Sequence, residues 1–95
     1  MSRVPQNRNK VIIHAFSRDD EVIDTIELLR DAYYDNGHPV IDSNEYRESH
    51  GISHIKGVIY DSKGVIQQVF ENQYNENGAY IHGRTEHADG TIIED

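Results

Sequence analysis

The pattern of apolar and polar residues predicts a short buried strand near the start of the chain. Residues 10–16 (KVIIHAF) form an apolar run rich in β-branched side chains, which is typical of such a strand. A second short strand is expected over residues 39–42. Residues 43–49 (SNEYRES) are interpreted as one or two helical turns or as a loop, and Gly51 ends this segment.

Hairpin signals dominate the second half of the chain. Apolar alternation of the kind found in strands predicts strands over residues 52–60, 65–74, 79–86 and 91–93. These segments are separated by turn sequences at residues 61–64 (DSKG), 75–78 (NENG) and 89–90 (DG). These strands would form an antiparallel meander. A helix over residues 65–74 remains an alternative, and the meander is expected to have three or four strands.

A long helix is predicted after the first strand. Ser17 is a suitable N-cap residue. Asp19, Asp20 and Glu21 would place negative charge in the first helical turn, where the helix dipole favours it. The helix is expected to run to about residue 35, because Gly37 can adopt the left-handed conformation that ends a helix.

The predicted helix would carry one purely acidic face. At about 100° per residue its carboxylates fall within about 80° of arc, and they belong to Asp20, Asp24, Glu27, Asp31 and Asp35. The apolar residues lie opposite, and they are Val22, Ile26, Leu29 and Tyr33. Stacked like charges cost roughly 0.2–0.5 kcal/mol per pair. A basic partner would explain the row, and a solvated face of an acidic protein is the alternative.

Together these elements predict an α+β fold. One long amphipathic helix would pack on a mostly antiparallel sheet, in the order strand, helix, strand, short helix or loop, and then three or four strands. A single helix covers one face of a sheet, so the other face would stay partly apolar. A homodimer formed through that face or through an edge strand is therefore expected.

Charge is unevenly distributed along the chain. The 95 residues have a net charge of -8. The basic residues Arg3, Arg8 and Lys10 stand in the first ten residues, which contain no acid, and all 17 acids follow. We interpret residues 1–9 as a flexible basic leader and residues 10–95 as a single α+β domain. Such an acidic domain should repel nucleic acid and anionic membranes.

Several classes of protein are excluded or disfavoured by composition. The chain contains no cysteine, which excludes disulfides, thiolate zinc sites and a cysteine nucleophile. No apolar run is long enough to span a bilayer, and the first residues lack the apolar segment of a signal peptide. A cytoplasmic location is expected, or the host cytoplasm if the protein is viral.

Histidines provide the candidate ligands of a zinc site, and binding of a divalent cation by the acidic row is a minor alternative because a straight row of carboxylates does not converge on one ion. His50 and His54 are four residues apart, and His82 and His87 flank a second segment. If the two pairs met, together with Glu48 or Glu86, they would complete a zinc site. Gly51 argues against a helix that would align the first pair. His14 stands in an apolar run and is interpreted as a core or interface residue rather than a ligand.

A binding function is favoured over catalysis. The sequence has no P-loop, no dinucleotide fingerprint and no nucleophile elbow, and no cofactor is expected. We interpret the chain as an acidic protein-binding or inhibitory module, a nucleic-acid mimic of viral or mobile-element type. Its partner would be a protein with a basic surface, such as a nucleic-acid-binding protein. The residues expected to bind it are Asp20, Asp24, Glu27, Asp31, Tyr34 and Asp35.

Two other functions stay open. The first is a small histidine-rich, metal-dependent enzyme built on the four histidines named above. The second is a dimeric domain that binds a small ligand between helix and sheet or at the dimer interface.

Overall fold

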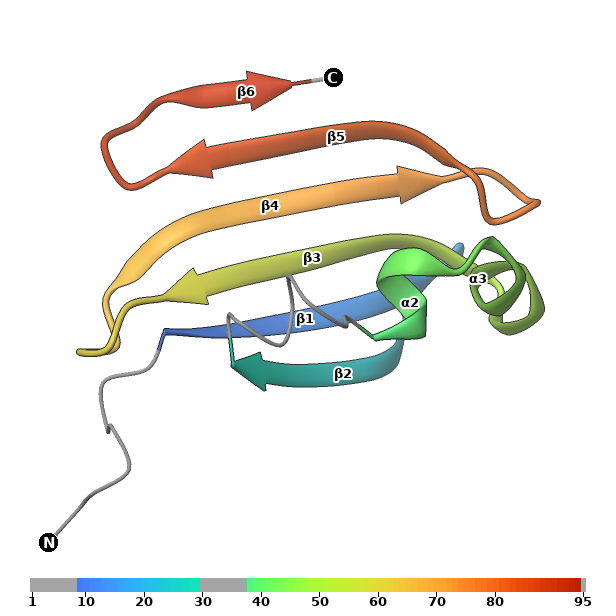
Figure 1. Ribbon diagram of the computed structural model, residues 1–95. Helices are drawn as coiled ribbons and strands as arrows, with labels where there is room; N and C mark the ends of the chain where they lie inside the picture. The colour runs from blue at the N-terminus through green and yellow to red at the C-terminus, as the bar shows by residue number, and fades with distance from the viewer. Residues whose placement is uncertain (1–8, 30–37, 95) are drawn as a thin grey trace, which may run out of the picture.

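The computed structural model describes residues 9–29 and 38–94, which form one antiparallel sheet with two short helices on one face (Figure 1). The strand order is β2-β1-β3-β4-β5-β6. The elements are β1 (Lys10–Ser17), β2 (Val22–Leu29), α2 (Pro39–Asp42), α3 (Asn44–His50), β3 (Ile52–Tyr60), β4 (Ile66–Tyr74), β5 (Tyr80–His87) and β6 (Ile92–Glu94).

The predicted long helix is wrong, and with it the predicted fold class. Residues 22–29 form β2, which pairs antiparallel with β1 and places Ile26 opposite Ile13 and Leu28 opposite Val11. This pairing buries Ile26, which is 5% exposed. Strands make up 58% of the described residues and short helices 14%, so no long helix packs on this sheet. The end of the predicted helix, with Gly37, lies outside the described residues.

Hairpin turns of one geometry connect β1 to β2, β3 to β4, β4 to β5 and β5 to β6. In the first, the Ser17 N–H donates to the Glu21 carbonyl over 2.9 Å and the Asp20 N–H donates to the Ser17 carbonyl over 3.0 Å. The same two bonds recur around residues 61–65, 75–79 and 87–91. The fourth residue has a positive φ in every case: Asp20, Gly64, Gly78 and Gly90. The predicted turns at residues 61–64, 75–78 and 89–90 are therefore confirmed.

Ser17 belongs to this turn and is not a helix N-cap. Its hydroxyl accepts the backbone N–H groups of Asp19 and Glu21, each over 3.2 Å. The Asp61 carboxylate and the Asn75 side-chain carbonyl do the same in their turns. A side-chain oxygen that accepts N–H groups a few residues later serves turns as well as helix starts.

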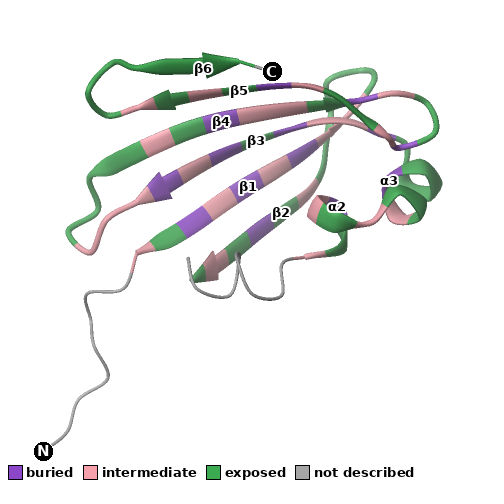
Figure 2. Ribbon diagram, turned by 45° about the horizontal axis from the view of Figure 1, so that its top comes forward, coloured by how far each residue is buried: buried purple, intermediate pink, exposed green. Residues whose placement is uncertain are grey.

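The hydrophobic core lies between the helices and one face of the sheet. Figure 2 shows buried residues concentrated in the central strands. Gly57 on β3 faces Phe70 on β4, and a Cβ at Gly57 would stand 2.1 Å from the phenyl ring. The core consists of Val11, Ile13, Ala15, Ile26, Val40, Ile52, Ile55, Ile59, Phe70 and Tyr74.

Residues 39–42, predicted as a strand, form helix α2. Pro39 stands at the start of the helix, where its missing N–H costs nothing, and the His38 Nδ1 accepts the Val40 N–H over 3.1 Å. The helical interpretation of residues 43–49 is confirmed by α3. The Ser43 hydroxyl accepts the Tyr46 N–H over 3.1 Å at its start, and Gly51 ends it with a φ of 66°.

Arg47 connects the two helices to the sheet. Its side chain is 4% exposed. The Nε donates to the Gly78 carbonyl over 2.8 Å, and the Nη1 donates to the carbonyls of Val40 and Ile41 over 3.1 and 2.8 Å. The guanidinium carbon stands 4.2 Å from the centre of the Tyr74 ring. One side chain therefore holds α2, α3 and the β4–β5 turn together.

Tyr74 is expected to make the fold sensitive to alkaline pH. Burial raises the pKa of its phenol, and the Asn72 side chain and the Arg47 charge offset part of that rise. The unfolded chain has the ordinary pKa of about 10, so the folded state retains the proton more strongly. This contribution to stability is complete below about pH 10 and is lost as the pH rises through the raised value.

We therefore expect Tyr74→Phe to lose less stability than the wild type between about pH 9 and pH 11. Urea unfolding at both pH values measures the difference. Tyr60→Phe serves as the control, because Tyr60 is half-buried on the face away from the helices. Equal losses in the wild type and Tyr74→Phe would show that this phenol does not control the alkaline response.

Candidate functional site

Acidic side chains from separate segments gather at one end of the sheet, which we call the acidic end. The β1–β2 turn, the helices α2 and α3, and the β4–β5 turn all lie at this end (Figure 1). Ser17 pairs with Ile52, directly after α3, and a Cβ at Gly78 would stand 2.2 Å from the Asn44 carbonyl oxygen. The exposed carboxylates are Asp19, Asp20, Glu21, Asp42, Glu45, Glu48 and Glu76.

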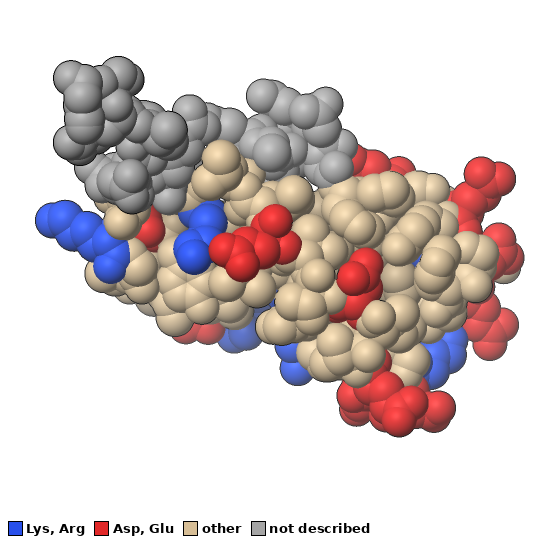
Figure 3. All heavy atoms as spheres, turned by 90° about the horizontal axis from the view of Figure 1, so that it is seen from below, with Lys and Arg blue, Asp and Glu red and all other residues tan. Residues whose placement is uncertain are grey.

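Few positive charges oppose this cluster. Within its described segments Arg18 is exposed, whereas Arg47 is buried beneath the surface. In Figure 3 acidic atoms project from the right-hand side of the molecule, which is the end that carries α3. The acidic end is thus a region of concentrated negative potential.

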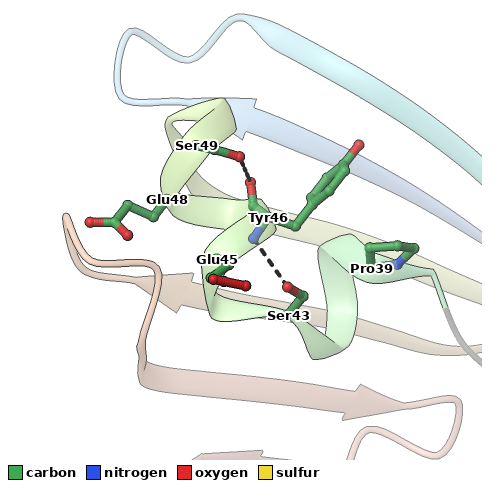
Figure 4. Close-up of a pocket in the computed structure, with 6 residues that line it drawn as sticks. All are labelled: Pro39, Ser43, Glu45, Tyr46, Glu48 and Ser49. Atoms are coloured by element: carbon green, nitrogen blue, oxygen red, sulfur yellow. Dashed lines mark hydrogen bonds between the residues drawn. The ribbon is translucent and has the colours of Figure 1, made fainter.

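An open groove of about 560 Å³ runs along the helices at the acidic end. It is lined by Pro39, Ser43, Glu45, Tyr46, Glu48 and Ser49 (Figure 4). The Ser43 hydroxyl accepts the Tyr46 N–H, and the Ser49 hydroxyl donates to the Tyr46 carbonyl over 3.1 Å. Within the described part of the chain neither Glu45 nor Glu48 forms an ion pair, so both carboxylates are available to a ligand.

Two histidine rings pack against Tyr46, which lines the groove. The Tyr46 ring stacks on the His50 ring with 4.0 Å between their centres, and it meets the His38 ring edge-on at 5.7 Å. The His38 Nε2 stands 3.7 Å from an Asp24 carboxylate oxygen. Tyr46 also packs against the core.

The residues predicted to bind a partner do not form one row. Asp20 lies in the β1–β2 turn at the acidic end, with its carboxylate 3.5 Å from the His54 Nε2. Asp24 and Glu27 lie on opposite faces of β2, because successive side chains of a strand alternate between faces and these two are an odd number of positions apart. The remaining predicted residues, Asp31, Tyr34 and Asp35, lie outside the described residues.

Most of the acidic end does not follow from the local sequence. Glu45 and Glu48 belong to a segment that the sequence leaves open as helical turns or a loop, and their placement at the same end as Asp19 and Glu76 depends on the strand pairing. The available signal was the set of turn sequences, each of which places acids at a hairpin end. It became informative only once the order of strands was known.

The candidate metal-binding histidines do not assemble. Among residues 9–29 and 38–94 no group of three or more histidine, aspartate or glutamate side chains could hold a metal ion. His54 stacks on Phe16 with 4.8 Å between ring centres, and His82 pairs with Glu94 at 3.5 Å. His14 lies half-buried on the face away from the helices, with its Nδ1 3.1 Å from the Thr25 hydroxyl.

His50 and Ser49 also fail to form a base and nucleophile pair. The His50 Nδ1 stands 2.9 Å from the Tyr46 carbonyl oxygen and 3.0 Å from the Ser49 hydroxyl. A carbonyl oxygen only accepts hydrogen bonds, so in this bond the Nδ1 carries the proton. It therefore cannot take the proton of Ser49, and the contact caps the end of α3.

No helix in the described part of the chain has both the length and the apolar character needed to cross a membrane. Comparison of the chain with protein-family models, with curated proteins and with solved structures gives no match.

Proposed function

We propose that the protein is an acidic binding module that docks its acidic end on a basic surface of a partner protein. The observation that carries this proposal is the convergence of exposed carboxylates from three chain segments on one end of the sheet. Like charges held close together repel one another, and a positively charged partner relieves that repulsion. Complementary charge also speeds encounter and fixes orientation.

The groove gives this surface a shape that suits a basic side chain. Glu45 and Glu48 supply carboxylates, while Pro39 and the Tyr46 ring supply apolar surface beside them. Arginine combines a planar cation with an apolar stem, so it can pair with a carboxylate and pack on a ring at the same time. A nucleic-acid-binding protein presents such side chains where it binds phosphates.

The test measures binding of a fluorescent deca-arginine peptide at low salt by anisotropy. We expect salt-sensitive binding to the wild type and about tenfold weaker binding to the Glu45→Lys, Glu48→Lys variant. These two substitutions reverse two charges at the groove and so make its net charge more positive by about four units. The matched control is Glu27→Lys, Glu86→Lys, which makes the same change of charge on the sheet face away from the helices. We expect it to bind within about twofold of the wild type.

Two outcomes would contradict the proposal. If both double variants lose affinity equally, the peptide responds to net charge and not to the acidic end. If the wild type does not bind the peptide even at low salt, the acidic end does not recognise arginine-rich chains.

A further inference from the structure

The face of the sheet opposite α2 and α3, called the open face, carries exposed apolar side chains among its polar ones. No described helix covers it, and antiparallel sheets that face water usually carry polar residues there. Val69 is 40% and Ile92 47% exposed on this face. Ile12, Phe16, Val58 and Tyr60 are half-buried beside them.

The two central strands carry complementary residues in register on the open face. Lys56 on β3 pairs with Glu71 on β4, and Val58 pairs with Val69. Lys56 is placed over the Phe16 ring, with its Nζ 5.5 Å from the ring centre. Within the described residues neither Lys56 nor Glu71 takes part in an ion pair, so both charges can be used by a partner.

We propose that two copies of the chain pack through their open faces about a two-fold axis that runs along the strands between β3 and β4. This axis places each β3 over the β4 of the other copy. Lys56 then faces the partner's Glu71, and Val58 faces the partner's Val69. A two-fold interface requires such self-complementarity, because each contact occurs twice with its members exchanged.

The dimensions and the remaining charges fit this arrangement. Six strands spaced about 4.8 Å apart, with central strands about 28 Å long, give a face of roughly 650 Å², which approaches the roughly 800 Å² per partner of a standard interface.

The Glu27 carboxylate is 3.3 Å from the Lys10 Nζ, and the Glu86 carboxylate is 3.9 Å from Arg84. These rim carboxylates therefore already have cationic neighbours.

The proposed dimer does not depend on the proposed binding function, but it has a consequence for that function. Rotation about an axis parallel to the strands does not change the position of an atom along the strand direction. Both acidic ends therefore emerge on the same side of the dimer, and one assembly presents two binding sites to a partner with repeated basic segments. Two linked sites raise the overall affinity without any new contact.

The test uses two single variants, Lys56→Glu and Glu71→Lys, and measures mass by light scattering after gel filtration. At about 100 μM we expect a dimer for the wild type and a monomer for each variant. An equimolar mixture of the variants should restore the dimer, because every position 56 then faces a position 71 of opposite charge. Within each separate chain the two positions keep like charge, so repair of the fold cannot explain the rescue.

Circular dichroism and urea unfolding establish that each variant is folded, and Val69→Arg provides a second disruption at an exposed position. A monomeric wild type at this concentration overturns the proposal. So does a mixture of the variants that stays monomeric. Dimers that survive all three substitutions and are lost on Ile93→Pro, at the β6 edge, overturn it in favour of edge pairing. Binding of the arginine peptide is measured in a separate experiment. A monomeric wild type would therefore contradict the dimer without contradicting the proposed function of the acidic end.

Discussion

Arg47→Leu is expected to lower the free energy of unfolding by about 3 kcal/mol, because three backbone carbonyls lose the donor that satisfies them. These carbonyls belong to Gly78 in the β4–β5 turn and to Val40 and Ile41 in α2. Leucine fills part of the volume but donates no hydrogen bond. Urea unfolding followed by circular dichroism measures the loss.

Two further variants separate the causes of this loss. Arg47→Lys keeps the charge but not the planar fork of donors, so we expect it to recover less than half of the stability. Arg84→Leu changes an exposed arginine and should shift stability by no more than about 0.5 kcal/mol. If Arg47→Leu unfolds at the same urea concentration as the wild type, the buried guanidinium contributes nothing net to the fold.

Gly78→Ala is expected to cost about 3 kcal/mol, of which about 1–2 kcal/mol arises from the left-handed backbone and the rest from a steric clash. Gly78 has a φ of 78°, and a Cβ there would stand 2.2 Å from the Asn44 carbonyl oxygen and 2.9 Å from the Glu48 nitrogen. Both are backbone atoms of α3, so the helix itself would have to shift.

The chain contains matched controls for this substitution. Gly64 and Gly90 occupy the same place in equivalent turns, with φ values of 84° and 92°, and a Cβ at either meets nothing within 4 Å. Gly64→Ala and Gly90→Ala therefore measure the backbone cost alone, about 1–2 kcal/mol. If all three variants lose the same stability, the β4–β5 turn does not press on α3. Thermal unfolding of the three proteins in parallel makes the comparison.

The sequence identified β1 and the later hairpins because their signals are local. Residues 10–16 form an apolar β-branched run, and the turns carry a glycine at the position that needs a positive φ. The β1–β2 turn has Asp20 at that position and no glycine. Its acids and Ser17 resemble the start of a helix, and nothing local distinguishes the two.

Residues 22–29 show why a local pattern does not distinguish β2 from a helix. In this short segment Ile26 and Leu29 fit a helical period, whereas Ile26 and Leu28 fit the alternation of a strand. Pairing with β1 decides between them, since it buries Ile26 against Ile13. That partner stands 13 positions earlier, beyond the reach of a local pattern. The acidic end was missed for the same reason, because strand order alone brings Glu45 and Glu76 to one end of the sheet.

The strand order has one further consequence, which concerns how the chain folds. Apart from the pairing of β1 with β3, every pairing of described strands joins strands that are consecutive along the chain. Such hairpins close short loops and form quickly, whereas the β1–β3 seam must bring distant segments such as Ile13 and Gly57 together. Docking of the β1–β2 hairpin on the sheet formed by β3 to β6 should therefore limit the folding rate. A longer chain between β2 and β3 should slow this step only slightly, because doubling the length of a loop adds only about 0.6 kcal/mol to the cost of closing it.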